Sequence, residues 1–463
     1  MLFSSITFLY CFLPCVLLVY FVVPDRMNNA VLLLASLFFY GWGEPKYLIF
    51  MLASVTQSYA AALLVERFRW TKIAKAALAV SAAASLGLLA YCKYADFFIG
   101  NFNAVTGLSV PLLRVALPVG ISFYTFQILS YVIDVYRGDV PVQRNFIDLA
   151  MYVAMFPQLI AGPIVRYSDI AGSLKNRKTT LSDMSTGAER FIIGLAKKVL
   201  VADILAATTD DIFGRMYTGI DVPTAWLGVL LYALVIYTDF SGYSDMAIGL
   251  GQMLGFNFNK NFDYPYISTS VSEFWRRWHI SLGSWFRDYI YIPLGGNRVS
   301  TGRHIRNILV VWALTGLWHG ASWNFVFWGI YYGLLLLAEK FLLGRFLEKA
   351  PVWLRNLYTM FAVIIGWVFF SQTTPAAIGK MLGSMFGFGA SCFADRASLY
   401  ALKSGLILMI ISVISCRPGL YQYFKRLARR NTYLAAVINA ILFFLCIAYM
   451  IYSSYTPFMY QQF

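Results

Sequence analysis

The sequence predicts an all-α polytopic membrane protein. Hydrophobic residues make up 59% of the 463 residues and charged residues only 13%, whereas soluble domains contain about 25% charged residues. Aromatic residues reach 17%, which suits packed membrane helices and interfacial belts. No polar stretch is long enough for a soluble domain, so we expect one integral-membrane domain over residues 1–463.

Apolar runs along the chain predict the individual membrane segments. A helix needs about 20 mainly apolar residues to span a bilayer, and on this basis we expect about eleven to thirteen segments. The candidates are 3–23, 29–42, 47–65, 76–96, 114–136, 186–209, 223–255, 305–321, 323–343, 354–371, 400–416 and 432–453. Residues 148–165 contain Pro157, Gly162 and Pro163, which predicts a broken or re-entrant helix buried in protein; the alternative is a simple kinked helix.

The net charge of +15 would suggest a nucleic-acid partner in a soluble protein. In a membrane protein, Lys and Arg in cytoplasmic loops orient the helices and meet anionic lipid. Basic residues concentrate in 66–75, 174–198 and 417–430, so we expect these segments on the cytoplasmic side and no nucleic-acid partner. Three scattered histidines and no Cys-x-x-Cys pair favour no metal site.

The stretch 256–306 is too polar to span a membrane and too aromatic for a free loop. Within it, Ser272 to Ile292 is predicted to form one amphipathic helix that lies in the interface or lines a wet cavity. Its expected apolar face contains Phe274, Trp278, Leu282 and Trp285, and its polar face contains Arg277, Ser281, Ser284 and Asp288.

His279 lies on this predicted helix. Arg276 precedes it by three residues, so its guanidinium can stand near the imidazole, and Glu273 can pair with Arg276. Arginines recognise phosphate and indoles stack on flat bases, so this segment suits an anionic, aromatic ligand. The alternative is an interfacial helix with Trp anchors and lipid-facing arginines.

His319 stands in an apolar segment, after Trp318 and between Gly316 and Gly320. An ionisable residue in such a segment indicates a functional site, and a neutral imidazole suits general-base catalysis on a hydroxyl or thiol. The alternative is a structural histidine bonded to a neighbouring helix.

A third polar cluster, from Tyr237 to Asp245, interrupts a long apolar run. Buried carboxylates need partners, and for Asp239 and Asp245 we expect the arginines of 273–306. A structural and pocket-shaping role is favoured over proton transfer.

Six pieces of the chain together resemble the membrane-bound O-acyltransferase (MBOAT) family, in its bacterial alginate O-acetyltransferase type. They occur in family order, with the most specific match in 239–321 and a motif core over 148–325. The pieces are Phe156 to Arg166, Asp239 to Gly249, Glu273 to Leu282, Trp285 to Asn297, Gly316 to Ala321 and Pro457 to Phe463.

The resemblance implies a ring of helices around a thin centre, with re-entrant and interfacial helices and a trans-membrane tunnel. It implies transfer of an acyl group, most simply acetyl, from a cytoplasmic thioester such as acetyl-CoA to an extracytoplasmic acceptor, for O-acetylation of an alginate-like exopolysaccharide or a cell-wall glycan. No permanently bound cofactor is implied. His319 resembles the family's catalytic histidine, and His279 resembles its second histidine near the cytoplasmic entrance.

The resemblance also implies binding residues, partners and a location for the protein. The donor or tunnel-binding residues we expect are Arg276, Arg277, Arg287, Trp275, Trp278, Trp318, Asp239, Tyr243 and Asp245. Expected partners are membrane lipid, a polysaccharide acceptor, and an extracytoplasmic SGNH-type acetyltransferase or small acceptor protein. The expected location is the bacterial cytoplasmic membrane. Alternatives are D-alanyl-type transfer to a wall polymer, a transporter, and a structural subunit of a polysaccharide export complex; the run Pro293 to Arg298 favours the acetylating type over the D-alanyl type.

Overall fold

The computed structural model describes residues 1–463 except 44, 161, 218, 391–395 and 453–463. Among the described residues the regular structure is entirely helical, as predicted. The chain divides into two compact units, one formed by Met1–Phe191 with Tyr243–Asn259 and one by Ile192–Gly242 with Lys260–Phe463. Two helices, α10 (Leu181–Ala196) and α12 (Val222–Met253), continue from one unit into the other.

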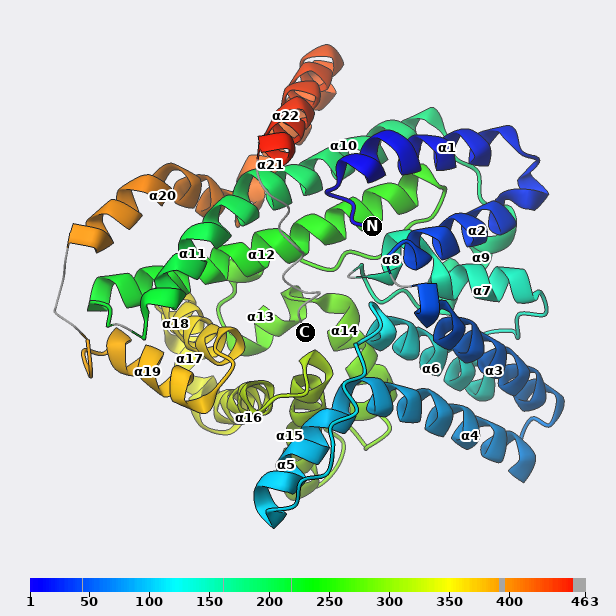
Figure 1. Cartoon of the computed structure of the whole chain (residues 1–463), viewed down its shortest axis with the longest axis horizontal. Coiled ribbons are helices and arrows are strands. Elements are labelled where there is room, and N and C mark those ends of the chain that lie inside the picture. The colour runs from blue at the N-terminus through cyan, green and yellow to red at the C-terminus, as the bar shows by residue number, and fades with distance from the viewer. Residues whose placement is uncertain (44, 161, 218, 391–395, 453–463) are drawn as a thin grey trace. The chain divides into compact units, whose positions relative to one another are not determined.

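In the part of the first unit that the structure describes there are nine further α-helices, which Figure 1 shows in blue to green-cyan. They are α1 (Leu13–Val22), α2 (Asn28–Gly41), α3 (Leu48–Arg67), α4 (Lys72–Leu89), α5 (Ala95–Thr106), α6 (Ile121–Arg137), α7 (Phe146–Ala154), α8 (Phe156–Leu159) and α9 (Tyr167–Asn176). Short π-helical or 3₁₀ turns are η1 (Phe8–Phe12), η2 (Asp25–Met27), η3 (Pro45–Tyr47) and η4 (Ala90–Tyr94).

The second unit contains the other helices. They are α11 (Asp203–Arg215), α13 (Val271–Arg277), α14 (Ile280–Phe286), α15 (Thr301–His319), α16 (Trp323–Ala338), α17 (Gly344–Lys349), α18 (Val352–Ser371), α19 (Pro375–Met385), α20 (Arg396–Ser415), α21 (Pro418–Arg430) and α22 (Thr432–Tyr452). Its short turns are η5 (Lys197–Ala202), η6 (Pro265–Ile267), η7 (Arg287–Tyr291) and η8 (Glu339–Leu343).

Six helices in the described part of the chain are long and apolar enough to cross a membrane, or seven if the bent pair of α20 and α21 counts as one. They are Pro45–Arg67, Lys72–Thr106, Val222–Met253, Trp323–Lys349, Val352–Ser371 and Thr432–Tyr452. These helices support a multi-pass membrane protein, but with fewer long spans than predicted. Among the predicted segments that fall short, α2 and α6 are only 14 and 17 residues long, and α15 carries Arg303 and Arg306.

The broken segment predicted at 148–165 is confirmed. Helix α7 ends at Ala154, Met155 leaves the helical region with ψ 115°, and α8 restarts at Phe156 with Pro157 in its first turn. The backbone N–H of Phe156, which the break removes from the helical pattern, donates to Ser36 Oγ at 3.0 Å. The break is therefore stabilised inside the protein, as irregular backbone at membrane depth requires.

The single helix predicted from Ser272 to Ile292 is wrong. Helix α13 ends at Arg277, and α14 begins at Ile280 after His279, whose φ of 45° is left-handed. The predicted apolar face is nevertheless buried, since Phe274, Trp278, Leu282 and Trp285 are 0–4% exposed. The periodicity indicated which residues face the core, but it could not show that tertiary contacts turn the backbone at His279.

Helices α15 and α16 form a close pair. A Cβ on Gly316 would overlap the carbonyl oxygen of Phe325, and one on Gly329 would overlap that of Trp312. Small residues at such positions let two helix backbones approach closely. The pair holds the end of α15, and therefore His319, against α16.

Candidate functional site

His319 is the last residue of α15 and is 5% exposed. Aromatic rings from α16 and α18 surround its imidazole, with ring centroids 4.9 Å away in Trp328, 5.1 Å in Phe370 and 6.3 Å in Phe325. The helix ends here because Gly320 takes up an extended conformation. The chain thus places a group that can accept a proton in a largely apolar, aromatic enclosure.

His279 is held by a polar partner that the sequence did not indicate, Asn261. The side-chain oxygen Oδ1 of Asn261 lies 3.1 Å from His279 Nδ1, and it accepts from the backbone N–H of Ser281 at 3.2 Å and from its hydroxyl at 2.9 Å. Because the Ser281 N–H can only donate, Oδ1 is the acceptor and His279 Nδ1 carries the proton. This tautomer leaves Nε2 as the acceptor nitrogen of the ring.

Asn261 also holds the backbone beside His279. Its carbonyl oxygen accepts the N–H of Ile280 at 2.9 Å, so both its backbone and its side chain stabilise the left-handed turn. Asn261 is 1% exposed. A signal for it existed in the sequence, since it lies in the unusually polar and aromatic stretch after Phe256, but its partner 18 residues away could not be identified there.

The indole of Trp318 contacts the rings of both histidines. The Trp318 ring centroid lies 5.8 Å from that of His279 and 5.1 Å from that of His319. Trp318 is 4% exposed and His279 is 2% exposed. Residues 40 positions apart in the sequence therefore meet around a single buried side chain, within one compact unit.

Burial lowers the pKa of His279 from 6.5 to about 3. The ring is therefore neutral at physiological pH, because charging it in this enclosure would cost the hydration of the cation. A neutral imidazole acts as a hydrogen-bonding or basic group and contributes no positive charge to the site.

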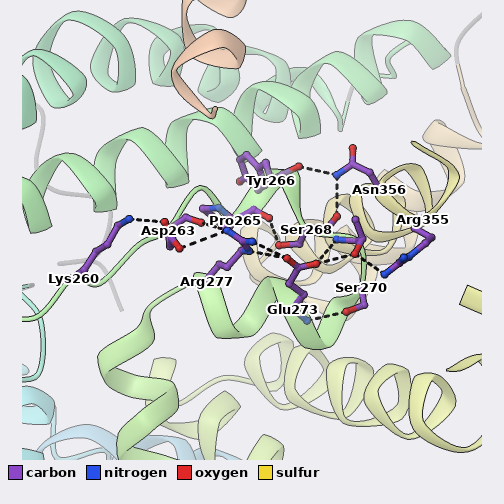
Figure 2. Close-up of polar contacts among 11 residues, drawn as sticks. Lys260, Asp263, Pro265, Tyr266, Ser268, Ser270, Glu273, Arg277, Arg355 and Asn356 are labelled. Atoms are coloured by element: carbon purple, nitrogen blue, oxygen red, sulfur yellow. Dashed lines mark hydrogen bonds and ion pairs between the residues drawn. The ribbon is translucent and has the colours of Figure 1, made fainter. Parts of the chain in front are cut away.

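The arginines near His279 take up different roles. Arg277 pairs with Glu273 at 2.8 Å and donates to the carbonyl oxygen of Asp263 at 3.1 Å, as Figure 2 shows. The expected pairing of Glu273 with Arg276 is therefore wrong, since an i, i+4 pair forms in place of the i, i+3 pair. Arg276 is exposed, whereas His279 is buried beyond the end of α13. Arg287 is also exposed and pairs with its neighbour Asp288 at 2.6 Å.

The network around Glu273 anchors the start of α13 (Figure 2). Glu273 accepts the backbone N–H of Thr269 at 2.8 Å and its hydroxyl at 2.9 Å. Arg355 of α18 donates to the Thr269 hydroxyl at 2.9 Å, and Asn356 donates to the carbonyl oxygens of Tyr266 and Ser268. These contacts bind the segment before α13 to α18.

Trp275 lies within α13 and Trp278 directly follows it, and both pack against other aromatic rings. The Trp275 ring is 4.7 Å from Tyr332 and 4.9 Å from Trp312, and the Trp278 ring is 4.9 Å from Trp367 and 5.1 Å from Phe262. They form part of the same aromatic core that encloses the histidines.

The carboxylates of α12 have partners that the sequence did not indicate. Lys198 Nζ lies 2.9 Å from Asp239 and 2.6 Å from Asp203, and this buried group belongs to the second unit. In the first unit, Arg190 pairs with Asp245 at 3.0 Å, and the Tyr243 ring stacks on Phe3 at 4.7 Å.

The expected pairing with the arginines of 273–306 is corrected by these contacts, because Arg190 comes from α10 and Lys198 from η5, both of which precede α12 in the chain. Phe240, the residue after Asp239, contacts the site directly, since its ring centroid lies 4.8 Å from that of His279. Asp239 thus anchors the part of α12 that packs on His279.

Within the described residues, no group of three or more His, Cys, Asp or Glu side chains is arranged to hold a metal ion. The C-terminal piece Pro457 to Phe463, the last of the six that resemble the family, lies outside the described residues.

The sequence of this chain is similar to a known protein family and to several of its members. Residues 47–378 match the model of the membrane-bound O-acyltransferase family (MBOAT). The chain is 42% identical to a "Probable alginate O-acetylase AlgI" of Azotobacter vinelandii, over 92% of this chain and 86% of the relative. It is 40% identical to the protein of the same name in Pseudomonas putida, over the whole of both chains. It is 35% identical to a "Peptidoglycan O-acetyltransferase" of Helicobacter pylori, over 84% of this chain and 80% of the relative.

Proposed function

Because this chain belongs to the membrane-bound O-acyltransferase family, we propose that it O-acetylates an extracytoplasmic polysaccharide, using a cytoplasmic thioester such as acetyl-CoA. The chain is a multi-pass membrane acyltransferase by family and by its apolar helices. The observation that carries the assignment of the site is the position of His279 and His319 around the Trp318 indole, in a buried aromatic enclosure. The names of three relatives support acetyl as the group and a glycan as the final acceptor.

The proposed chemistry assigns the proton transfer to His319. Its neutral ring takes the proton of an acceptor hydroxyl, and the oxygen attacks the thioester carbonyl to form the new C–O bond. As the C–S bond breaks, the imidazolium returns the proton to the leaving thiolate, so that the products are an ester and a free thiol. Imidazole is the side chain suited to this exchange, because an unperturbed histidine gains and loses a proton near neutral pH.

His279 is proposed to contact the donor on the cytoplasmic side. Its Nδ1 is engaged with Asn261, so we assign the contact with the donor to Nε2, the acceptor nitrogen of the ring. The exposed guanidinium group of Arg276 is proposed to contact the donor's phosphates, for which arginine is well suited, and Arg287 would do so by exchanging its pair with Asp288. Arg277 contributes indirectly, by holding Glu273 and the start of α13.

The proposed route needs access to His319 from both membrane faces. We infer a ring of helices with a thin centre and a tunnel through it, in the bacterial cytoplasmic membrane. We propose that an SGNH-type extracytoplasmic partner or a small acceptor protein receives the acyl group and passes it to the polysaccharide.

The test uses inside-out membrane vesicles that contain the full chain and receive acetyl-labelled acetyl-CoA on their outer, cytoplasmic face. The proposal predicts label on material in the lumen, and at least about a hundredfold loss in His319→Ala, the usual size of a general-base contribution. His304→Gln is the matched control, because His304 is a buried histidine on the same helix that bonds to Tyr291. It should retain most of the activity.

Folding of the variants is checked by thermal unfolding, with His319→Gln as a conservative second variant. A folded His319→Ala protein that transfers label at the wild-type rate would overturn the assignment. Luminal uptake of an intact solute without transfer of label would identify a transporter.

A further inference from the structure

Helix α21 (Pro418–Arg430) lies at a steep angle to the apolar helix before it. The axes of Gly405–Ser415 and Pro418–Ala428 are bent by 77°. The bend follows from the sequence: Arg417 is extended, with ψ 150°, and Pro418 is at the first helical position, where its missing N–H costs nothing. Asn431 is again extended before the membrane-spanning α22. Figure 1 shows the three helices in orange to red.

The residues of α21 are sharply segregated around the helix. Apolar side chains recur at i, i+3, i+4 and i+7, namely Leu420, Tyr423, Phe424 and Leu427. At 100° per residue, Lys425 and Arg426 fall outside this face and Arg430 lies at its border next to Tyr423, and the helix contains no acidic residue. Water does not suit the apolar face of such a helix, and hydrocarbon does not suit its cationic face.

The apolar face of α21 is open in the protein itself. Tyr423 is 61% exposed and Phe424 is 40% exposed, although α21 packs against both α20 and α22. Tyr421, which borders this face, is 45% exposed. The ammonium group of Lys425 lies 6.0 Å from the centre of the Tyr421 ring, so a cation is held directly beside the aromatic edge. This pairing of an aromatic ring and a cation is typical of side chains at the headgroup level.

We propose that α21 lies in the plane of the cytoplasmic leaflet and binds anionic phospholipid. Its apolar face enters the boundary between headgroups and acyl chains, and Lys425, Arg426 and Arg430 contact the phosphates. The adjoining apolar helix α22 keeps α21 next to the bilayer. It is long enough to span the bilayer, and only 11% of the residues in its apolar window are buried within the protein. The cluster of basic residues favours the cytoplasmic side, where anionic lipid attracts such segments. This inference is independent of acyl transfer.

The first experiment measures lipid preference. The full chain is reconstituted in phosphatidylcholine vesicles, and the immobilised fraction of spin-labelled phosphatidylglycerol is compared with that of spin-labelled phosphatidylcholine. The wild type should prefer phosphatidylglycerol, and the preference should decrease in high salt. In the variant Lys425→Gln/Arg426→Gln/Arg430→Gln, the affinity for phosphatidylglycerol should fall at least about fivefold, the effect of losing one basic contact.

The matched control is Arg67→Gln/Lys72→Gln/Lys75→Gln, which removes three exposed basic residues from another segment expected on the cytoplasmic side. It should retain most of the preference. An equal loss in both variants would show a general charge effect and would overturn a specific role for α21.

The second experiment measures depth. Nitroxide labels are placed at Phe424→Cys and at Gln422→Cys, in a background in which the exposed Cys11 and Cys15 are replaced by Ser. The label at 424 should be more accessible to oxygen, which concentrates in lipid, and the label at 422 more accessible to a water-soluble nickel chelate. Equal exposure of both positions to the chelate would overturn the in-plane arrangement and would leave the face of α21 to an acidic protein partner. Loss of acyl transfer in a His319 variant changes neither readout, so this proposal and the proposed function fail separately.

Discussion

The carboxylate of Glu339 accepts the backbone N–H of Ser272 at 2.9 Å and its hydroxyl at 2.7 Å. Glu339 follows α16 and is 6% exposed, and it also accepts the N–H of Val271. A carboxylate at a helix N-terminus satisfies N–H groups that have no partner within the helix and interacts favourably with its dipole. Glu339 therefore holds the first turn of α13, whose far end leads directly to His279.

Replacing Glu339 should weaken that anchor. Glu339→Gln removes the charge but keeps the shape, and we expect a loss of about 1.5–3 kcal/mol, typical of hydrogen bonds to a charged group. A displaced α13 would also move His279, so acyl transfer should fall. Thermal unfolding and the vesicle assay measure the two effects. Glu348→Gln, at an exposed position, is the control, and equal behaviour of the two variants would contradict the anchoring role.

The close approach of α15 and α16 makes Gly316 sensitive to a single methyl group. Gly316→Ala places a Cβ against the carbonyl oxygen of Phe325, and overpacking of this kind costs about 1–3 kcal/mol. Gly302→Ala is the control on the same helix, because a Cβ there meets no atom within 4 Å. Alanine should leave α15 as stable or more stable at position 302, since it has the higher helix propensity. Melting temperatures of the two variants decide the point.

The buried group of Lys198, Asp203 and Asp239 should depend strongly on its cation. Lys198→Met leaves two carboxylates without the ammonium that lies 2.6 and 2.9 Å from them, and breaking a buried pair costs about 3–5 kcal/mol. Arg144→Gln should cost at most about 1 kcal/mol, because its pair with Glu66 is exposed. Denaturation in detergent measures both. Lys198→Met/Asp203→Asn/Asp239→Asn should recover part of the loss, and no recovery would argue against the electrostatic explanation.

Acidification should destabilise the protein through His279. Its pKa is about 3 in the folded state, against 6.5 ordinarily, so between these pH values the unfolded chain binds a proton that the folded chain does not. Stability therefore rises with pH through this window and falls as the pH decreases. His279→Gln cannot titrate, so its melting temperature should depend less on pH between about 4 and 6.5. Parallel curves for the two proteins would contradict the burial of a neutral ring.

Local pattern predicted much of the fold. The segments expected at 223–255, 354–371 and 432–453 correspond to α12, α18 and α22 within a few residues. An apolar run of about 20 residues is long enough to span the bilayer as a helix, so its position predicts the helix well. The break before Phe156 was also predictable, from Pro157. Shorter segments were overestimated, because length and scattered charges decide whether an apolar helix can span.

The sequence by itself determined the membrane class, the family resemblance and the choice of His279 and His319, because composition, apolar run length and motif order are properties of the chain alone. Only the tertiary structure decided that the backbone turns at His279, that Asn261 orients its ring, and that Trp318 lies next to both imidazoles. It also decided that Lys198 and Arg190 are the partners of the α12 carboxylates. Hydrogen bonds and ion pairs between distant residues depend on how helices pack, and periodicity within one segment carries no information about that packing.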